Sequence, residues 1–571
     1  MPIRTMNNLL NLNPQKIKKM KLAELEGLAN DIRKFLIDVI KHNGGHLGPN
    51  LGVVELTIAL HYVFNSPYDQ FIFDIGHQAY THKILTGRAK GFDKLRRSGG
   101  VSGFTNYDES KHDIWESGHA GTSLSALMGV LYSNKIDKSN NHAIAIVGDG
   151  ALSSGMSLEA LNLIGYHKLP GIIVINNNKM SISKSVGTIS ELLNNDFDNK
   201  KQFFNQLGYN FVEVEDGHNI TDLIKSFEEV KKTTKPVVVL VNTIKGKGLE
   251  EAENDKIGKY HMVSSNKSDG TTWSALIADM ILEIQEEIPT MVVVPAMEVG
   301  SHLTKFKEAY PNRFLDVGIS EEHAATMSAA LAKNNKNVIL SLYSTFSQRA
   351  FDQILNDIAR SNQPVLITID RAGLIPGDGD THQGIYDVSM FNIMPNIVIS
   401  APSNAQDASD LLRVGLKSKS PFVLRFPRGF VEGDLRYEER LITINWDQVL
   451  TGDEINIISY GPLVERIKEI CKTENISANL FNAKFIRPID YNMLQKAFNN
   501  QKPILIIEEG VNTGSLYPEI LRFKENMGLT SPLIDKSIKN TNIPHLASDE
   551  ILEFTQFDNK SLSLFIKNAI R

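Results

Sequence analysis

Cysteine is nearly absent from this sequence. Its 571 residues include a single cysteine, Cys471. One thiol excludes an intramolecular disulfide and a cysteine-based zinc site, which stabilise many small secreted or zinc-binding domains. The sequence therefore predicts a reducing, cytoplasmic setting.

Long apolar runs and a strong excess of one charge are absent as well. No stretch of about 18 uncharged apolar residues occurs, so we expect no membrane-spanning helix. The basic N-terminus lacks the apolar core of a secretory signal. The 60 Lys and Arg residues stand against 66 Asp and Glu residues, which gives a formal net charge of −6. This balance predicts no binding to nucleic acid or to an anionic membrane surface.

Two common phosphate-binding loops are also missing. There is no Walker A sequence, and no GxGxxG string lies between an apolar run and a helical stretch. P-loop NTPases and dinucleotide-binding domains need these glycine patterns to bring backbone amides close to a phosphate. Both nucleotide-binding classes are therefore excluded.

The sequence does contain a regular alternation of two kinds of segment. Apolar runs of strand length, such as 142–150 and 171–178, are separated by stretches with helical periodicity. The same alternation returns at 337–429 and at 455–510. Strands that alternate with helices form parallel sheets covered on both faces. The sequence therefore predicts an α/β fold of three doubly wound domains with mainly parallel sheets.

Two interruptions of this alternation predict the domain boundaries. The polar stretch 245–272 is the candidate linker, and a helix is expected to begin near Trp273. The pattern is interrupted again near 432–452. We therefore expect three domains, at 1–272, 273–440 and 441–571.

The most informative motif joins two neighbouring apolar runs. Gly148-Asp149-Gly150 ends the first run and Asn176-Asn177-Asn178 ends the second. Because the carboxyl ends of parallel strands line the crevice where α/β proteins bind ligands, Asp149 and Asn178 are expected to lie close together. Carboxylate and amide oxygens suit Mg²⁺, and glycines let a diphosphate approach the backbone. Each motif alone is typical of an ordinary turn, but their spacing predicts a metal–diphosphate site.

This pairing resembles the thiamin-diphosphate motif, and the chain as a whole resembles the 1-deoxy-D-xylulose-5-phosphate synthase family of transketolase-like enzymes. The strings DIGHQAYTHKILTGR (74–88) and DRAG…THQG (370–384) distinguish this family from ordinary transketolases. The other similar segments are GGHLGPNLGVVELTIALHYVFNSPYDQ (44–70), GHAGTS (118–123), GDGALSSGMSLEALN (148–162), NNNKMSIS (176–183), VGISEEHAATMSAALA (317–332), LYSTFSQRAFDQILNDIA (342–359) and FPRG (426–429).

The resemblance implies a role for each domain and a set of cofactor contacts. Residues 1–272 are expected to bind the diphosphate and Mg²⁺, 273–440 the pyrimidine ring and the acceptor phosphate, and 441–571 to form the C-terminal transketolase-like domain. The implied metal ligands are Asp149, Asn178 and the Met180 carbonyl. The implied thiamin-diphosphate contacts are His77, Gly118, His119, Ala120, Gly150, Ala151, Asn178, Leu249, Glu321 and Phe346.

The catalytic candidates are one glutamate and three histidines. Glu321 matches the family glutamate that touches the aminopyrimidine ring, where a carboxyl hydrogen-bonds a ring nitrogen and promotes deprotonation of the cofactor. Taken alone, Glu321-Glu322 is typical of an acidic helix start. His46, His261 and His382 match active-site histidines of the family, and imidazole titrates near neutrality. His82 lies five residues after His77, which is poor spacing for a zinc pair on a helix. Whether His82 is functional or structural stays open.

A phosphorylated acceptor requires cations. Arg371 and Arg428 each follow an expected strand of the middle domain, and guanidinium groups bind phosphate through two parallel hydrogen bonds. An arginine in a surface ion pair is the ordinary alternative. The resemblance adds Tyr343, Arg349 and Asp378 as acceptor-side contacts.

Four features depart from the family pattern. The stretch between Ser183 and Asn210 is short, which implies a reduced flap over the active site. Pro49-Asn50 stand where small hydroxyl residues or glycine are common. Ala120 replaces a frequent serine and Leu249 a frequent tyrosine. The first two affect the expected fit of the acceptor, and the last two the expected cofactor contacts.

The resemblance implies a homodimeric transferase that decarboxylates pyruvate and condenses the two-carbon unit with D-glyceraldehyde 3-phosphate. Its product is 1-deoxy-D-xylulose 5-phosphate, a precursor for isoprenoid, thiamin and pyridoxal synthesis. The main alternative is a paralogous thiamin-diphosphate enzyme with a different sugar-phosphate or aldehyde acceptor. A true transketolase is disfavoured by the two distinguishing strings, and a non-catalytic relative by the presence of the metal ligands and Glu321.

Overall fold

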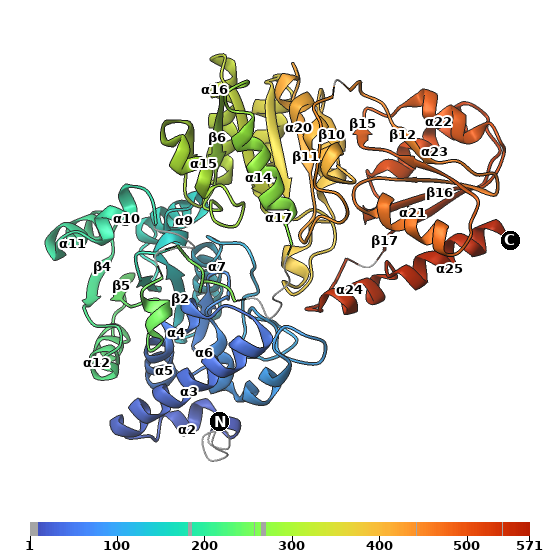
Figure 1. Ribbon diagram of the computed structural model, residues 1–571. Helices are drawn as coiled ribbons and strands as arrows, with labels where there is room; N and C mark the ends of the chain where they lie inside the picture. Colours follow the sequence, from blue (N-terminus) through green and yellow to red (C-terminus); the bar gives the residue numbers. More distant parts are fainter. Residues whose placement is uncertain (1–8, 181–184, 256, 264–269, 441, 540) are drawn as a thin grey trace. The chain divides into compact units, whose positions relative to one another are not determined.

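The chain folds into two compact units (Figure 1). The computed structural model describes residues 9–571 except 181–184, 256, 264–269, 441 and 540. One unit comprises Met1–Lys267 with Gly318–Ser320, and the other comprises Ser268–Val317 with Glu321–Arg571. Over the described residues the first unit contains one β-sheet and the second contains two. The expected α/β class with three mainly parallel sheets is therefore confirmed.

The sheet of the first unit is entirely parallel, and its strands follow the spatial order β1 (Gln70–Phe73), β2 (Ala143–Gly148), β3 (Ile172–Asn177), β5 (Val237–Asn242) and β4 (Asn210–Val214). Successive side chains of a strand point to opposite faces. Ile144 and Ile146 of β2 accordingly belong to one core, and Ala145 and Val147 to another. A strand buried on both faces reads as a continuous apolar run, which is why β2 and β3 were recognisable in the sequence.

Helices cover both faces of this sheet. One core includes residues of α3 (Leu22–Asn43), α5 (Val54–Val63) and α12 (Ile220–Val230). The opposite core includes residues of α7 (Ser123–Asp137), α9 (Gly155–Tyr166) and α11 (Phe197–Gln206). The start of α12 shows how the sequence sets a boundary, because the Asn219 side chain accepts hydrogen bonds from the backbone N–H groups of Thr221 and Asp222.

The second unit contains a seven-stranded sheet in the order β15 (Phe485–Arg487), β10 (Val398–Ser400), β11 (Phe422–Arg425), β9 (Val365–Asp370), β8 (Asn337–Tyr343), β6 (Thr290–Val294) and β7 (Phe314–Asp316). Strands β6 to β11 are parallel to their neighbours, whereas β15 is antiparallel to β10. The helices associated with it include α14 (Trp273–Glu283), α16 (Glu321–Lys333) and α20 (Ala405–Lys417).

The third sheet has the order β12 (Asp447–Leu450), β14 (Ala478–Asn482), β13 (Ile455–Ser459), β16 (Ile504–Val511) and β17 (Leu533–Ile538). Only β12 is antiparallel among its described pairings. Its surrounding helices are α21 (Leu463–Thr473), α22 (Tyr491–Phe498), α23 (Leu516–Asn526), α24 (Ser548–Thr555) and α25 (Asn559–Ile570). Strand β15 leaves this part of the chain to pair with β10, so the C-terminal region is joined to the middle sheet by backbone hydrogen bonds. Figure 1 shows β15 beside β10.

Residues 245–263, the first part of the expected linker, are packed on the first unit. The Gly246 N–H donates to the Gly48 carbonyl at 3.0 Å, and the Gly48 N–H donates to the Tyr260 carbonyl at 2.8 Å. Gly45 and Val263 form an isolated antiparallel bridge. The remaining linker residues 264–269 lie outside the described part of the chain. Helix α14 begins at Trp273 as expected, with the Thr272 side chain accepting from the Ala275 N–H.

No helix in the described residues has the length and apolar character needed to cross a membrane.

Candidate active site

Asp149 lies at the carboxyl end of the central strand β2. It opens the short helix α8 (Asp149–Leu152), and only 1% of its surface is exposed. Its Oδ2 accepts a hydrogen bond from Ser185 Oγ at 3.0 Å. Burial raises the pKa of Asp149 to about 6, although Ser185 and backbone amides favour the ionised form. A carboxylate desolvated in this way is suited to pairing with a cation.

Asn178 lies beyond the end of the adjacent strand β3. The backbone N–H of Met180 donates to Asn178 Oδ1 at 3.0 Å and closes a tight turn. Since Gly148 of β2 is paired with Asn176 of β3, Asp149 and Asn178 follow neighbouring strands at the same edge of the sheet. The expected juxtaposition of these two strand ends is therefore present. Their oxygens are hard donors of the kind that Mg²⁺ prefers.

A cavity of about 880 Å³ adjoins this edge. Its lining includes Asn178 and Met180 from the β3 end and Lys245 from the β5 end. Burial lowers the pKa of Lys245 to about 8, against the opposing charges of Asp255 and Asp149. The cavity therefore combines acidic, amide and ammonium groups, as a site for a metal and a charged ligand requires.

The segment Gly118-His119-Ala120 is held at the end of β1. Asp74, directly after β1, accepts hydrogen bonds from the backbone N–H groups of Gly121 and Ser123 at 2.9–3.1 Å. These amides lead into α7, so the carboxylate also stabilises the positive end of that helix. Asp74 thus fixes the expected cofactor segment next to the β1–β2 edge.

Three of the predicted histidines form one cluster. The ring centroids of His46, His77 and His261 are 5.5–5.6 Å apart in every pair. Burial lowers the pKa of His77 to about 3, with a smaller effect from the charge of Lys245. His77 is therefore a neutral imidazole at physiological pH. Its Nδ1 is buried and has no hydrogen-bond partner within the described part of the protein.

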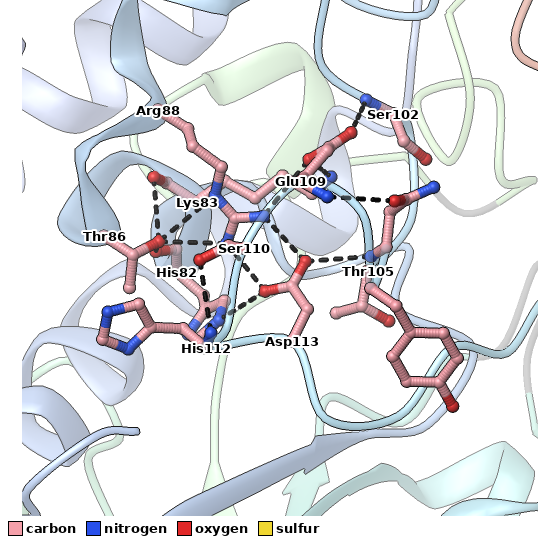
Figure 2. A network of polar contacts seen from close by, with 12 residues as sticks. His82, Lys83, Thr86, Arg88, Ser102, Thr105, Glu109, Ser110, His112 and Asp113 are labelled. Carbon is pink, nitrogen blue, oxygen red and sulfur yellow. Dashed lines mark hydrogen bonds and ion pairs between the residues drawn. The ribbon is translucent and has the colours of Figure 1, made fainter. Parts of the chain in front are cut away.

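His82 belongs to a different environment, a buried polar network (Figure 2). Its Nδ1 lies 2.9 Å from His61 Nε2, and its Nε2 lies 3.0 Å from Asp113 Oδ1. The Arg88 guanidinium binds both oxygens of Asp113 at 2.7 Å. The side chains of His82 and Asp113 are fully buried. The open question about His82 is thus resolved in favour of a structural contact.

The remaining first-unit candidates are backbone or apolar groups. Gly150 and Ala151 are buried in α8, next to Asp149. Ala120 is 8% exposed, and Leu249 packs partly buried against the apolar core that contains α3 and α5. Their expected cofactor contacts stay predictions.

In the second unit, Glu321 is the first residue of α16 and is 4% exposed. Burial raises the pKa of its carboxyl to about 6, and the charge of Arg349 opposes this. Arg349 Nη1 lies 3.7 Å from Glu321 Oε2. A carboxyl with this pKa exchanges a proton readily near neutral pH, as an acid–base group does.

Four other candidates of the second unit lie in a row, each in contact with the next. The Arg371 guanidinium lies 4.0 Å from the centroid of the Tyr343 ring. Tyr343 stacks on Phe346 at 5.6 Å, and Phe346 meets His382 edge to face at 5.7 Å. Arg371 is also bound by Asp370 at 2.5 Å and donates to Ser274 and to the Gly300 carbonyl. The structure therefore brings together a cation, two aromatic rings and an imidazole.

Arg428 and Asp378 form the second cationic group. Arg428 Nη1 donates to Asp378 Oδ2 at 2.7 Å, and the Arg428 side chain keeps 34% of its surface exposed. Arg371 is 23% exposed and has more partners within the protein. Arg428 is consequently the arginine that is better able to turn toward an incoming anion.

Comparison with known proteins gives the same assignment along the whole chain. Residues 10–202 and 195–243 match the family model described as 1-deoxy-D-xylulose-5-phosphate synthase. Residues 269–432 match the transketolase pyrimidine-binding domain, and residues 445–562 the transketolase C-terminal domain. A 1-deoxy-D-xylulose-5-phosphate synthase of Lysinibacillus sphaericus is 39% identical over 600 aligned residues, which cover 95% of each chain. The chain belongs to the 1-deoxy-D-xylulose-5-phosphate synthase family.

Other members of the 1-deoxy-D-xylulose-5-phosphate synthase family are about equally similar. The Listeria monocytogenes enzyme of that name is 40% identical over 586 residues, covering 98% of this chain and 96% of its own. Among solved structures, a Campylobacter jejuni transketolase covers 96% of this chain and 100% of its own, with 16% identity and a TM-score of 0.46.

Asn50, one of the departures from the pattern of the 1-deoxy-D-xylulose-5-phosphate synthase family, forms hydrogen bonds with three backbone groups beside the histidine cluster. It is fully buried, and its Nδ2 donates to the carbonyls of His46 and His77, each at 2.7 Å. Its Oδ1 accepts from the Tyr80 N–H at 2.9 Å. Asn50 therefore ties two clustered histidines together, a role that its position in the sequence did not indicate.

The match to the 1-deoxy-D-xylulose-5-phosphate synthase family model divides into two pieces that overlap at residues 195–202, within the stretch that follows Ser183. Helices α10 (Thr188–Leu193) and α11 fill most of this stretch. Residues 181–184 lie outside the described part of the chain, so the expected reduction of a flap stays a prediction.

Several further residues of the site were missed from the sequence. Asp74 and Lys245 each follow a strand end, and that position was the signal that could have identified them. Ser185 and Asp370 act through side-chain contacts to Asp149 and Arg371 that no local pattern announces.

Proposed function

We propose that this chain is a 1-deoxy-D-xylulose-5-phosphate synthase that decarboxylates pyruvate and joins the two-carbon unit to D-glyceraldehyde 3-phosphate. The observation that carries the proposal is the 39% identity to an enzyme of that name over 95% of both chains. The products are 1-deoxy-D-xylulose 5-phosphate and CO₂. The cytoplasmic setting expected from the sequence stays a prediction.

Family membership implies thiamin diphosphate as the cofactor. Bound thiamin diphosphate supplies an electron sink for the decarboxylation of a 2-oxo acid. The first unit fits such a group, because a buried carboxylate and an imidazole nitrogen with no hydrogen-bond partner among the described residues stand near strand ends that carry glycine-rich turns. Asp149, Asn178 and the Met180 carbonyl would hold Mg²⁺, and His77, Gly118 to Ala120, Gly150 and Ala151 would contact the cofactor.

The metal assignment predicts the effect of one substitution. Asp149→Ala removes the only carboxylate of the proposed ligand set and should abolish calorimetrically detectable binding of Mg²⁺ together with thiamin diphosphate. Asp198→Ala, which removes an exposed carboxylate from α11, is the matched control. Undiminished binding in the Asp149 variant would contradict the assignment.

The proton-transfer roles fall to Glu321 and to histidines of each unit. Glu321 would exchange a proton with the aminopyrimidine ring, which its raised pKa favours. His46, His261 and His382 would each hold or move a proton during the reaction. Phe346, which stacks on Tyr343 and meets His382 edge to face, would support the pyrimidine ring.

The acceptor phosphate would bind to the arginines of the second unit. Arg428 is the more exposed of the two, and Asp378 neutralises it until a phosphate competes for the guanidinium. Arg371 would contribute positive charge from a fixed position over Tyr343. Tyr343, Arg349 and Asp378 would define the remaining acceptor side.

A homodimer is the proposed assembly. Met156, Leu163 and Tyr166 recur on one face of α9, and each is at least 36% exposed. Exposed apolar side chains at this spacing form a stripe that a second copy of the chain can cover. Helix α9 begins six residues after Asp149, so the stripe lies close in sequence to the proposed metal site.

An acceptor panel tests the function. The purified enzyme with thiamin diphosphate and Mg²⁺ receives pyruvate and, in parallel, D-glyceraldehyde 3-phosphate, D-glyceraldehyde, D-erythrose 4-phosphate or D-ribose 5-phosphate. CO₂ release and product mass are recorded. The proposal requires the highest kcat/KM with D-glyceraldehyde 3-phosphate. Preference for another aldehyde would establish the second candidate, a paralogous enzyme, which the short stretch between Ser183 and Asn210 favours.

A further inference from the structure

The acceptor side of the second unit includes a loop that connects β9 to helix α19 (Asp387–Asn392). Residues 375–384 carry Asp378 and His382, and Gln383 braces the loop from within. The Gln383 side chain accepts from the Ile375 N–H and donates to the Ile375 and Gly379 carbonyls at 2.8–2.9 Å. The loop is therefore an ordered structure whose position determines where Asp378 lies.

A segment from the far C-terminal region packs against this loop. The Gly377 N–H donates to the Leu546 carbonyl at 2.8 Å. The ring of His545 lies against Gly379, where a Cβ built on the glycine would stand 2.5 Å from Cε1 and 2.7 Å from Nδ1. Gly379 has a φ of +75°, and the contact leaves no space for a side chain. The His545 imidazole thus packs directly against Gly379, the residue that follows Asp378.

The two segments share one apolar core. Ile543 and Leu546 are 0% and 5% exposed, and they belong to the same cluster as Leu374 and Ile385, which flank the loop. This cluster also contains residues of β13 and β16 in the third sheet. The C-terminal domain therefore contacts the loop in two ways. It shares an apolar core with the residues that flank the loop, and its His545 packs against Gly379.

The loop also contacts Arg428, the more exposed of the two arginines. Arg428 Nη1 donates to Asp378 Oδ2 at 2.7 Å and to the Pro376 carbonyl at 3.3 Å, so both partners of this guanidinium lie in or beside the segment that His545 contacts. A shift of the loop would move the carboxylate that competes with phosphate for Arg428. The side chain of His545 therefore influences the acceptor site through Gly379 and Asp378.

We propose that His545 is a positioning residue through which the C-terminal domain sets the affinity for the acceptor phosphate. This inference rests on the proposed function, because it assigns the phosphate of D-glyceraldehyde 3-phosphate to Arg428. His545 acts on the loop and is not placed among the groups that touch the reacting atoms. The C-terminal domain thereby takes part in acceptor selection.

The decisive measurement compares two acceptors that differ only in the phosphate. In the holoenzyme, His545→Ala should raise the KM for D-glyceraldehyde 3-phosphate by a factor within the range of roughly 2 to 150 that contacting residues show. The KM for pyruvate and the kcat/KM for D-glyceraldehyde should stay unchanged. General destabilisation of the enzyme would reduce kcat/KM for both acceptors alike. That result, or an unchanged KM and kcat/KM with both acceptors, would overturn the proposal.

A pair of glycine variants tests the contact itself. Gly379→Ala introduces a Cβ that collides with the His545 ring, and it should reproduce the phosphate-specific loss. In the His545→Ala background the same substitution should add little, so the two effects should be non-additive. Gly528→Ala is the control, because it has a φ of +62° and no atom within 4 Å of the new Cβ. Fully additive effects would contradict the contact.

The outcome is distinguishable from a failure of the proposed function. If the unsubstituted enzyme forms no 1-deoxy-D-xylulose 5-phosphate, the function is wrong, and the His545 variants then have no phosphate preference to lose. If the unsubstituted enzyme forms the product and His545→Ala keeps its preference for the phosphorylated acceptor, only the role of His545 is refuted.

Discussion

At the scale of single residues, the sequence named the chemical groups and the structure supplied their environment. Asp149 and Glu321 were recognisable from motifs, but their pKa values of about 6 arise from burial by distant parts of the chain. Asn50 is the opposite case. From the sequence, Asn50 indicated only that a small residue common in the family is replaced. In the structure its side-chain amide forms hydrogen bonds with three backbone groups around the clustered histidines. Hydrogen-bond partners 27 to 30 residues away cannot be read from local pattern.

The raised pKa of Glu321 favours proton exchange but lowers the stability of the folded protein near neutral pH. A carboxyl whose pKa is raised by folding binds its proton more tightly in the folded state. Its stabilising contribution is complete below pH 4.5 and is lost as the pH rises through about 6. A shift of this size corresponds to about 2 kcal/mol. Without cofactor, Glu321→Gln should therefore gain about 2 kcal/mol in unfolding free energy relative to the wild type between pH 4.5 and pH 7.5.

Urea unfolding of the cofactor-free protein at several pH values measures this difference. Glu322→Gln is the matched control, because it removes the same charge from the neighbouring, less buried position. The Glu321 variant should also slow the turnover of the loaded enzyme by about 10²- to 10⁴-fold, the usual contribution of an acid–base group. A pH-independent stability difference would show that the carboxyl is not desolvated in the folded protein.

At the scale of elements, strands buried on both faces were the most predictable feature. Strands β2 and β3 and the start of α14 at Trp273 lie where the sequence placed them, because continuous apolar runs and a capping threonine are local signals. The antiparallel pairing of β15 with β10 was not predictable, since it joins residues more than 80 positions apart. The backbone hydrogen bonds that join residues 245–263 to residues 45–48 could not be predicted for a related reason, because the polar composition of 245–263 gives no sign of them.

The network around His82 shows how two elements are joined by charge (Figure 2). Lys83 and Arg88 follow His82 along α6 (Tyr80–Lys83) and the turn after it, while Glu109 and Asp113 lie in the loop that leads to Gly118. Burial alone would raise the pKa of Asp113, but hydrogen bonds from His82 and Arg88 hold it well below its usual range. The stabilisation is therefore present above about pH 4 and is lost as the pH falls further.

Substitution of Asp113 should unlock these elements. Asp113→Asn keeps the size of the side chain but removes the closer charge partner of the 10% exposed Arg88 guanidinium and leaves it only Glu109, at 3.2 Å, among the described carboxylates. Removing one member of a buried ion pair costs about 3–5 kcal/mol, and urea unfolding at pH 7 should show a loss of this order. Asp108→Asn, in an exposed position of the same loop, should change the stability by less than about 0.5 kcal/mol. Equal stability of the two variants would mean that the network contributes nothing.

At the scale of the whole molecule, the residue patterns predicted the fold class, whereas only the family resemblance predicted the activity. The succession of strands and helices predicts an α/β chain, but many enzymes with different chemistry share that class. The assignment depended on strings such as residues 74–88, whose members are scattered in the fold. His77 lies in the histidine cluster, whereas His82, Lys83 and Arg88 belong to the buried network. Residues 74–88 therefore include both a candidate active-site residue and residues of a structural network. For this reason the string identifies the family but did not show which of the two groups His82 belongs to.

The proposed homodimer gives the prediction that belongs to this scale. Leu163 and Tyr166 are 42% and 77% exposed on the same face of α9, and exposed apolar stripes of this kind commonly mark contacts between subunits. Carboxylates placed at such a contact would be buried without a charge partner, so Leu163→Glu combined with Tyr166→Glu should convert the dimer to monomer at micromolar concentration. Light scattering after size exclusion measures the mass directly, with 63.6 kDa expected for one chain. Leu564→Glu, on the 59% exposed Leu564 of α25, is the control and should leave the mass unchanged. A dimer that survives the double substitution on α9 would place the subunit contact on another surface.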